Sequence, residues 1–255
     1  METAYLEQLA CFAAQTPGSA IPSDVRQRAV TILTDCVGCI IAGARMPEVT
    51  ALITHLEGRQ GEPMATVLGT QRRLMAPDAA FVYGTAGTWH DLDEGNLHTR
   101  AHAAIQIVPA ILAEAEVRAA TGKELIDALI FAYEVAGRLW RATQARFAVH
   151  PHGTYGPLAA AVSLARLRGE SPEQIYAAMN IGMTLGIAAS RQTLGDGATI
   201  RNTYSGHSGR AGYDALAFRD VGLTGERDAP SSILGDLYGE AFAPDIAAAD
   251  LNDVW

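Results

Sequence analysis

Apolar residues recur at spacings of three and four along most of this chain. The segment VRQRAVTILTDCVGCIIAG places Val25, Ala29, Ile32 and Cys36 on one side of a helix. Alternation of β-branched and polar residues, the usual pattern of a strand, is almost absent. The pattern predicts an all-α protein, a multi-helix bundle forming a single domain over residues 1–255. The predicted helices cover about 3–15, 23–43, 47–57, 77–90, 103–120, 123–142, 155–168, 172–189, 206–221 and 231–238.

Several of these helices carry start and stop signals. Ser23 is a candidate N-cap, and Pro172 stands after a serine and before a glutamate, as expected for the first helical position. Gly43, Gly169 and Gly222 lie where helices are predicted to stop. These signals place several helix boundaries independently of the apolar periodicity.

Two features depart from amphipathic helices. The segment PMATVLG (63–69) has an extended pattern but is too short to build a sheet. The helices at 103–120 and 123–142 are apolar over much of their circumference, so we expect them at the centre of the fold or at a subunit interface. A closed twofold homodimer is the commonest way to bury such a surface, and the sequence predicts one here.

Composition and charge restrict the compartment and the partners. The longest apolar stretches, 36–44 and 128–137, fall short of the roughly 20 residues that span a bilayer, and the amino terminus, METAYLEQ, lacks a signal-peptide pattern. We therefore expect a cytoplasmic protein with no membrane partner. The formal net charge of −9 argues against a nucleic-acid partner, because such binding depends on clustered Lys and Arg. An anionic substrate needs a local basic site.

The lysine and cysteine content excludes several chemistries. Lys123 is the only lysine and lies in the first turn of a predicted helix, where a solvated side chain is expected. Schiff-base and P-loop chemistry are therefore disfavoured. The three cysteines form no disulfide framework, and Cys36 and Cys39 fall at helical spacing, which indicates packing rather than metal or redox chemistry.

Three polar clusters carry the candidate chemistry. The run from Trp89 to His102 follows a predicted apolar helix and combines His90, Asp91, Asp93, Glu94, His98, Arg100 and His102. Its carboxylates end one helix and its last imidazole approaches the next, so an acid/base pair can converge on one pocket. The alternative is a polar helix–helix connection in which a carboxylate caps amides.

The second and third clusters suit an anionic ligand. His150, His152 and Tyr155 lie in a Pro/Gly-rich loop just before an alanine-rich helix, whose amides favour anions, and one of the two histidines is expected to be structural only. Further along, Arg201 and Arg210 stand among small residues, and guanidinium groups offer bidentate bonds to carboxylates. Surface salt bridges are the alternative for both arginines.

These segments together resemble the MmgE/PrpD family, which includes 2-methylcitrate dehydratase, cis-aconitate decarboxylase and iminodisuccinate epimerase. The resemblance covers nearly the whole chain and rests on four motifs in the family's order. They are VRQRAVTILTDCVGCIIAGA, GTAGTWHDLDEGNLHTRAHA, FAVHPHGTYGPLAAAVSLARLRG and IRNTYSGHSGRAGYDALAFRDVGLTGE.

The resemblance implies an enzyme, a lyase or isomerase, that abstracts a proton next to a carboxylate of a small di- or tricarboxylic acid, with no metal and no cofactor. It makes Asp91 and His102 the leading catalytic pair and His150 a substrate-facing residue. Arg201 occupies a position that is lysine in the decarboxylase and dehydratase branches. Because arginine holds carboxylates but is a poor proton donor, the substitution favours an epimerase of an amino or imino dicarboxylate.

The remaining roles follow from the same resemblance. His102 and His150 are candidate bases, and Asp91 either orients an imidazole or acts as the base. Arg201 and Arg210 are expected to bind substrate carboxylates, with His152 and Tyr155 as secondary contacts.

The family also has a smaller lid domain after the helical domain. This chain ends at LNDVW, where the lid is expected to begin. The expectation is therefore a fragment, a separate lid domain or subunit, or a protein that works without a lid.

Two other classes of function compete with this interpretation. His90 and Asp91 are adjacent, as in HD-type metal phosphohydrolases, with His55 and Asp127 as possible outer ligands. A non-catalytic helical subunit or pseudoenzyme of the same family is favoured by the missing lid and by Arg201.

Overall fold

The periodic segments fold as helices in the computed structural model, which describes residues 3–59 and 61–255. The all-α prediction is confirmed, and most boundaries agree within a few residues. The longer helices are α1 (Ala4–Gln15), α2 (Ser23–Gly43), α3 (Pro47–Glu57), α4 (Ala76–Gly87), α5 (Ala104–Arg118), α6 (Gly122–Arg141), α7 (Gly156–Arg168), α8 (Pro172–Thr184) and α10 (Thr203–Asp220). The short ones are η1 (Gly18–Ala20), α9 (Gln192–Gly195), η2 (Thr199–Asn202), the π-helical η3 (Ser231–Leu237) and α11 (Pro244–Ala248).

Extended structure is limited to two antiparallel pairs within the described residues. The predicted extended segment contains β1 (Ala65–Thr66), which pairs with β2 (Arg73–Leu74). The second pair, β3 (Thr143–Ala145) with β4 (Gly239–Phe242), has no counterpart in the sequence prediction. The expectation of a single extended segment was therefore wrong, because pairing between distant residues leaves no local pattern.

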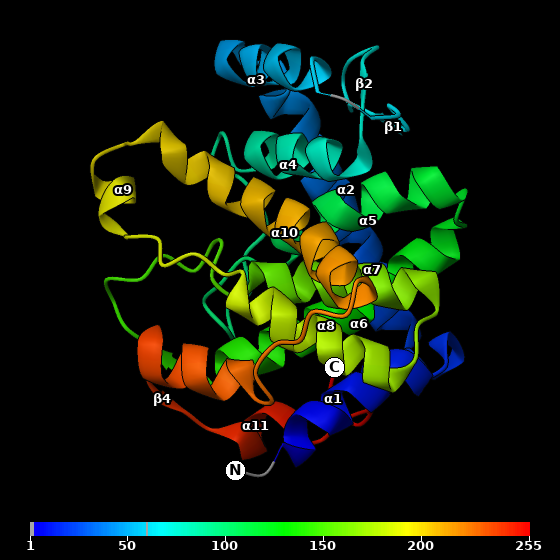
Figure 1. Ribbon diagram of the computed structural model, residues 1–255, viewed down its shortest axis with the longest axis vertical. Helices are drawn as coiled ribbons and strands as arrows, with labels where there is room; N and C mark the ends of the chain where they lie inside the picture. The colour runs from blue at the N-terminus through cyan, green and yellow to red at the C-terminus, as the bar shows by residue number, and fades with distance from the viewer. Residues whose placement is uncertain (1–2, 60) are drawn as a thin grey trace.

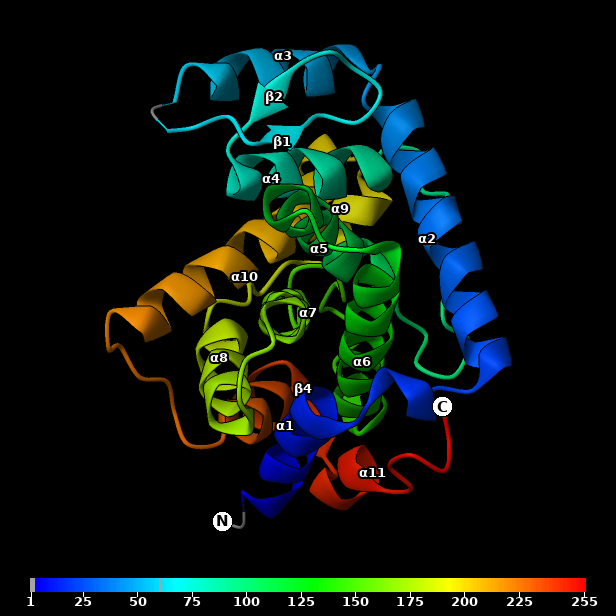
Figure 2. The same ribbon diagram turned by 90° about the vertical axis from the view of Figure 1, so that its right-hand side faces the viewer.

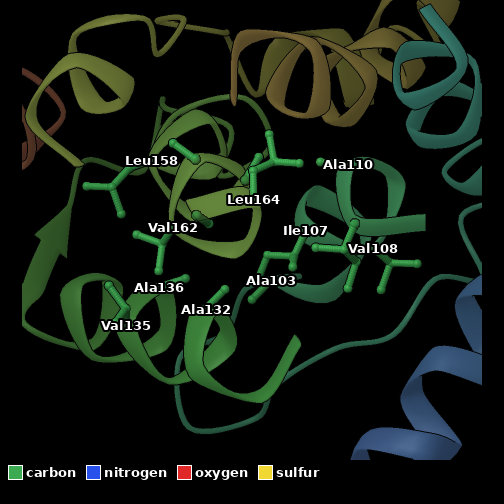
Figure 3. Packing of buried hydrophobic residues seen from close by; sticks show 14 of the residues in the cluster. Ala103, Ile107, Val108, Ala110, Ala132, Val135, Ala136, Leu158, Val162 and Leu164 are labelled. Atoms are coloured by element: carbon green, nitrogen blue, oxygen red, sulfur yellow. The ribbon is translucent and has the colours of Figure 1, made fainter. Parts of the chain in front are cut away.

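Helices α5, α6 and α7 form the centre of the molecule. Figure 3 shows Ile107 and Val108 from α5, Val135 from α6, and Leu158 and Val162 from α7 within one packed cluster. Helix α5 also contacts α4 and α10, so it is surrounded by the fold. The apolar circumference of α5 and α6 is thus explained by burial inside one chain. This burial agrees with the expected central position of the two helices, and the homodimer stays a prediction.

The ends of helices follow the predicted signals in part. Ser171 caps α8 in a reciprocal capping box with Gln174, and Gly169 ends α7 in a left-handed conformation. Ser23 was wrongly predicted as an N-cap: it is the first helical residue, preceded by Pro22, and makes no capping hydrogen bond.

Three loops gather at one side of the molecule, as Figure 1 shows for the segments that precede α5, α7 and α10. Val149 and Ser190 form an antiparallel bridge between two of the loops. The Thr88 hydroxyl donates to the carbonyl of Asn202 at 2.8 Å and so ties the end of α4 to η2. Helix α1 packs against α11 at the end of the molecule opposite α3, as both Figure 1 and Figure 2 show.

No single helix within the described part of the chain has the length and hydropathy to cross a bilayer. Helices α2 and α3 pass such a test only together, and they are bent by 88° relative to each other.

Candidate active site

The three polar clusters of the sequence meet where the loops gather. The rings of His102 and His152 lie 4.9 Å apart between centroids, as do those of His150 and His152. The Tyr204 ring lies 5.6 Å from that of His150. Residues from three separate segments therefore surround a single set of imidazoles.

His102 is held as a cation. Its Nδ1 lies 2.6 Å from the carbonyl oxygen of Glu94 and 3.2 Å from the carboxylate of Asp93. A carbonyl oxygen only accepts, so Nδ1 carries a proton. The hydrogen bond with buried Asp93 raises the pKa of His102 to about 9, against the opposing effect of burial. His102 is therefore an imidazolium at neutral pH and a proton donor. From the sequence, His102 is a candidate base, and its catalytic role stays a prediction.

His150 is held neutral. Burial, followed by the nearby charge of Arg201, lowers the pKa of His150 to about 4. Its Nδ1 accepts the backbone N–H of His152 at 3.1 Å, so the single proton of the neutral ring sits on Nε2. In this arrangement His150 presents an N–H to a ligand.

His152 is the most enclosed of the three imidazoles, with 2% of the residue exposed. Burial lowers the pKa of His152 well below its usual value. Its Nε2 lies 3.9 Å from the Asp93 carboxylate, and neither ring nitrogen has a hydrogen-bond partner among the described residues. His152 thus fills the space between His102 and His150 as a neutral ring.

Asp91 pairs with Arg201 and not with His102. An Arg201 Nη2 donates to Asp91 Oδ1, and Nη1 donates to the side chain of Asn202 at 2.9 Å. Asp91 is more than half exposed, whereas the guanidinium of Arg201 is buried. The predicted pair of Asp91 with His102 is therefore replaced by two ion pairs, Asp93 with His102 and Asp91 with Arg201.

The backbone explains how two aspartates so close in sequence separate. Asp91 has a φ of 56°, a left-handed conformation that aspartate tolerates better than most residues. This turn ends the helical direction of α4, and Asp93 enters the interior while Asp91 stays at the surface.

Glu94 is a further buried carboxyl beside His102. Its Oε1 accepts the backbone N–H of Ala104 at 3.0 Å and the hydroxyl of Tyr133 at 3.2 Å. Burial raises the pKa of Glu94 to about 7. The alternative interpretation, in which a carboxylate of this run caps amides, therefore holds for Glu94 at the start of α5.

The only described side chains grouped closely enough to hold a metal ion are Asp93, His102 and His152, with donor atoms within 4.8 Å of one another. The protonated Nδ1 of His102 faces Asp93, which is the arrangement of a hydrogen-bonded ion pair. The ligand set proposed for an HD-type phosphohydrolase is not assembled, because Asp127 pairs with Arg26 and Lys123.

A family model described as the MmgE/PrpD N-terminal domain matches residues 7–235. The chain belongs to the MmgE/PrpD family. It is 27% identical over 214 residues to the cis-aconitate decarboxylase-like protein oryM of Aspergillus oryzae, covering 79% of this chain and 44% of that protein. It is 26% identical over 201 residues to the cis-aconitate decarboxylase of Aspergillus terreus, covering 75% and 41%. The matches span less than half the length of these relatives.

Two predicted site residues of this MmgE/PrpD chain lie apart from the charged groups. Arg210 donates to Asp78 at 2.5 Å and stacks over the ring of Phe81 at 4.1 Å. No hydrogen bond or ion pair between described residues links Arg210 to His102, His150 or His152, and its binding of a substrate carboxylate stays a prediction. Tyr155 is buried with its ring 4.8 Å from that of Trp140, and burial raises its pKa well above the usual value. Tyr155 lies directly before α7, at the end of the loop that carries His150 and His152.

Two residues that organise the site were not assigned a role from the sequence. Asp93 was recognised only as part of an acidic run. Gln106 accepts the backbone N–H of Gly153 at 2.9 Å and donates to the carbonyl of His102 at 2.9 Å. It also accepts the hydroxyl of Ser208 at 3.1 Å, so one buried amide joins all three polar segments. A glutamine in the first turn of a helix whose next seven residues are all apolar is the signal that could have found it.

Proposed function

We propose that this chain provides the acid and charge-stabilising groups of an enzyme that abstracts a proton next to a carboxylate of a small di- or tricarboxylic acid. The observation that carries the proposal is the contrast between two neighbouring imidazoles. His102 is cationic because of Asp93, and His150 is neutral because of burial and Arg201. Groups driven to opposite protonation states in one pocket are typical of acid/base sites.

Asp91 is the candidate base. Its carboxylate is more than half exposed at the mouth of the cluster, and its partner Arg201 fixes it from the buried side. A base must reach the substrate, and Asp91 is the accessible carboxylate next to the three imidazoles. Arg201 then serves both to orient Asp91 and to attract the substrate carboxylate next to the reacting carbon.

The negative charge that develops on that carboxylate during proton abstraction is stabilised by hydrogen-bond donors. The Nε2–H of neutral His150 and the guanidinium of Arg201 can supply them, and a well-placed donor contributes about 3 to 4 kcal/mol to such a transition state. His102, as an imidazolium, can then deliver a proton to a leaving hydroxyl or to carbon.

The outcome after proton abstraction is loss of hydroxide, loss of carbon dioxide or return of the proton to the other face. The two relatives are named for decarboxylation of cis-aconitate, which makes cis-aconitate the first compound to test. Arginine at 201 is always charged and transfers protons poorly, so it favours epimerisation of a dicarboxylate over a step that needs a proton from this position. No metal or cofactor enters this scheme, and activity should survive dialysis against a chelator.

The full chain can be tested by incubation in deuterated water with cis-aconitate and a panel of dicarboxylates, followed by NMR of C–H exchange. The parent should exchange the proton next to a carboxylate. His102→Gln should slow exchange or turnover by roughly 100-fold, the scale for a group that transfers protons. His55→Gln, an exposed histidine on α3, is the matched control and should leave the rate unchanged.

Absence of exchange for every compound, in a folded parent that still binds them, would identify a non-catalytic subunit. A lid domain or subunit and a homodimer stay predictions, and adding residues equivalent to the rest of the relatives tests the first of them.

A further inference from the structure

Arg191 lies beside His150 in a short antiparallel ladder. The backbone N–H of His150 donates to the carbonyl of Ala189 at 2.8 Å, and that of Arg191 donates to Ala148 at 2.8 Å. Between these hydrogen bonds, Val149 and Ser190 form the bridge that pairs the two loops. The position of Arg191 is thus fixed by the same backbone pairing that positions His150.

This pairing directs the two side chains to the same face. Val149 lies opposite Ser190, so His150 lies opposite Ala189 and is the diagonal neighbour of Arg191. Side chains alternate along a strand, and diagonal neighbours on one face are about 7 to 8 Å apart, within reach of a long side chain. The guanidinium is close enough to lower the pKa of His150, after burial and Arg201.

Arg191 has no carboxylate partner in the described part of the chain. Its Nε is buried without a hydrogen bond, and its guanidinium lies 4.8 Å from the centroid of the Phe147 ring. By contrast, Arg201 and Arg210 each pair with an aspartate. A buried guanidinium N–H without a partner is unfavourable, and an anion bound at Arg191 would supply the missing acceptor.

We propose that Arg191 binds a second carboxylate of the substrate, the one that does not border the reacting carbon. Arg201 and Arg191 then approach His150 from η2 and from the 185–191 loop, so a ligand on His150 meets a guanidinium from each. The Arg191 guanidinium lies over the Phe147 ring, and a guanidinium offers a pair of N–H groups to a carboxylate. This inference rests on the proposed function and assigns the residue that selects dicarboxylates over monocarboxylates.

Binding of matched acids tests the assignment directly. Calorimetry on the full chain compares succinate with butyrate and glutarate with pentanoate, so each pair differs by one carboxylate. The parent should bind at least one of the two dicarboxylates about tenfold or more tightly than its monocarboxylate, the ratio expected for one charge-assisted hydrogen-bonded contact. Arg191→Gln should remove that ratio by weakening dicarboxylate binding alone. Arg191→Lys should restore part of it.

Arg146→Gln is the matched control. Arg146 is exposed on the loop that carries His150 and has no side-chain partner among the described residues. It should leave the ratio unchanged. An NMR titration of each variant shows whether the site is intact: in Arg191→Gln the pKa of His150 should move upward from about 4 while His102 keeps its own.

Equal affinity of the parent for both members of both pairs overturns the role of Arg191, as does an unchanged ratio in Arg191→Gln. Neither result touches the proposed function, which fails separately if the parent exchanges no C–H proton. A ratio that depends on Arg191 without any exchange would keep the binding role and remove the catalytic one.

Discussion

Three histidines within one cluster have three different roles because their surroundings differ. His102 has a buried carboxylate within 3.2 Å and is about one-third exposed, so its charged form is stabilised. His150 and His152 are buried next to positive charge, so their neutral forms prevail. The protonation state of each imidazole therefore follows from its surroundings: the Asp93 carboxylate for His102, and burial followed by nearby positive charge for His150 and His152.

Asp93→Asn tests whether the Asp93 carboxylate keeps His102 protonated. The substitution keeps the shape of the side chain but removes the charge that holds His102 protonated, so the pKa of His102 should fall from about 9 toward or below its ordinary value. NMR titration of the ring protons measures the change. Asp91→Asn is the control and should leave the titration of His102 nearly in place. A pKa of His102 that stays near 9 in Asp93→Asn would contradict the assignment.

Arg201→Lys should not be conservative although the charge is kept. Arg201 bonds Asp91 with one nitrogen and Asn202 with another, and a lysine ammonium cannot reproduce this planar geometry. We expect ligand binding to weaken by about 1 to 3 kcal/mol, the range for a hydrogen bond to a charged group. The residual activity should keep its pH dependence.

Calorimetry and a pH profile of C–H exchange measure the two effects. A lysine variant that binds as tightly as the parent, or that gains dehydratase or decarboxylase turnover, would show that Arg201 replaces a proton donor.

For individual residues, the sequence predicted which segments meet but not which side chains pair. The family resemblance assigned His102, His150 and Arg201 to one site, and the structure brings their segments together. The choice between Asp91 and Asp93 depends on a left-handed backbone at Asp91, which no local pattern requires.

The helix that follows Arg201 is positioned by glycines. Helix α10 crosses α4 where Gly84 and Gly206 face each other: a Cβ added to Gly206 would lie 2.3 Å from the carbonyl oxygen of Phe81. Because η2 leads directly into α10, this crossing sets the distance between Arg201 and the loop that carries Asp91. Glycine is needed here for close approach and not for an unusual backbone angle.

Gly206→Ala should therefore destabilise the fold by about 1 to 3 kcal/mol, the usual effect of overpacking a tight contact. Gly38→Ala is the control, since a Cβ at this helical position meets nothing within 4 Å. It should raise stability by up to about 1 kcal/mol through helix propensity. Urea unfolding measures both, and equal effects of the two substitutions would show that the crossing tolerates a methyl group.

Helices were predictable where apolar residues recur at helical spacing and a proline or capping residue marks the start. Helices such as α2, α3 and α8 begin within a residue of their predicted starts, because proline and capping residues mark them. The strands β3 and β4 lie about 100 residues apart and were missed, since only tertiary contact pairs them. Strands of three and four residues are also too short to show an alternation of apolar and polar residues.

In the molecule as a whole, the burial of the central helices accounts for their many apolar residues and for the position of Gln106 beside the histidines. Helix α5 carries Gln106 in its first turn and is apolar from Ile107 to Ala113, where it is surrounded by α4, α6, α7 and α10. The homodimer stays a prediction, and sedimentation of the chain at micromolar concentration measures it.

The ionisation of the site also makes stability depend on pH. His102 has a folded pKa of about 9, above its ordinary 6.5, so its contribution is complete below pH 6.5 and is lost as the pH rises to 9. Glu94, with a pKa raised from 4.5 to about 7, loses its contribution earlier, between those values. His150 acts in the opposite sense, because its lowered pKa removes stability as the pH falls from 6.5 to 4.

Between pH 7.5 and 9 the main contribution that changes is therefore that of His102. The free energy of unfolding of the parent, measured in urea, should decrease with pH across this interval, because the unfolded chain binds fewer protons there than the folded one. His102→Gln should flatten the decrease, whereas His55→Gln should keep it. A parent whose stability is constant over the interval would mean that His102 is neutral in the folded protein, and the proton donor of the proposed reaction would have to be sought among other groups.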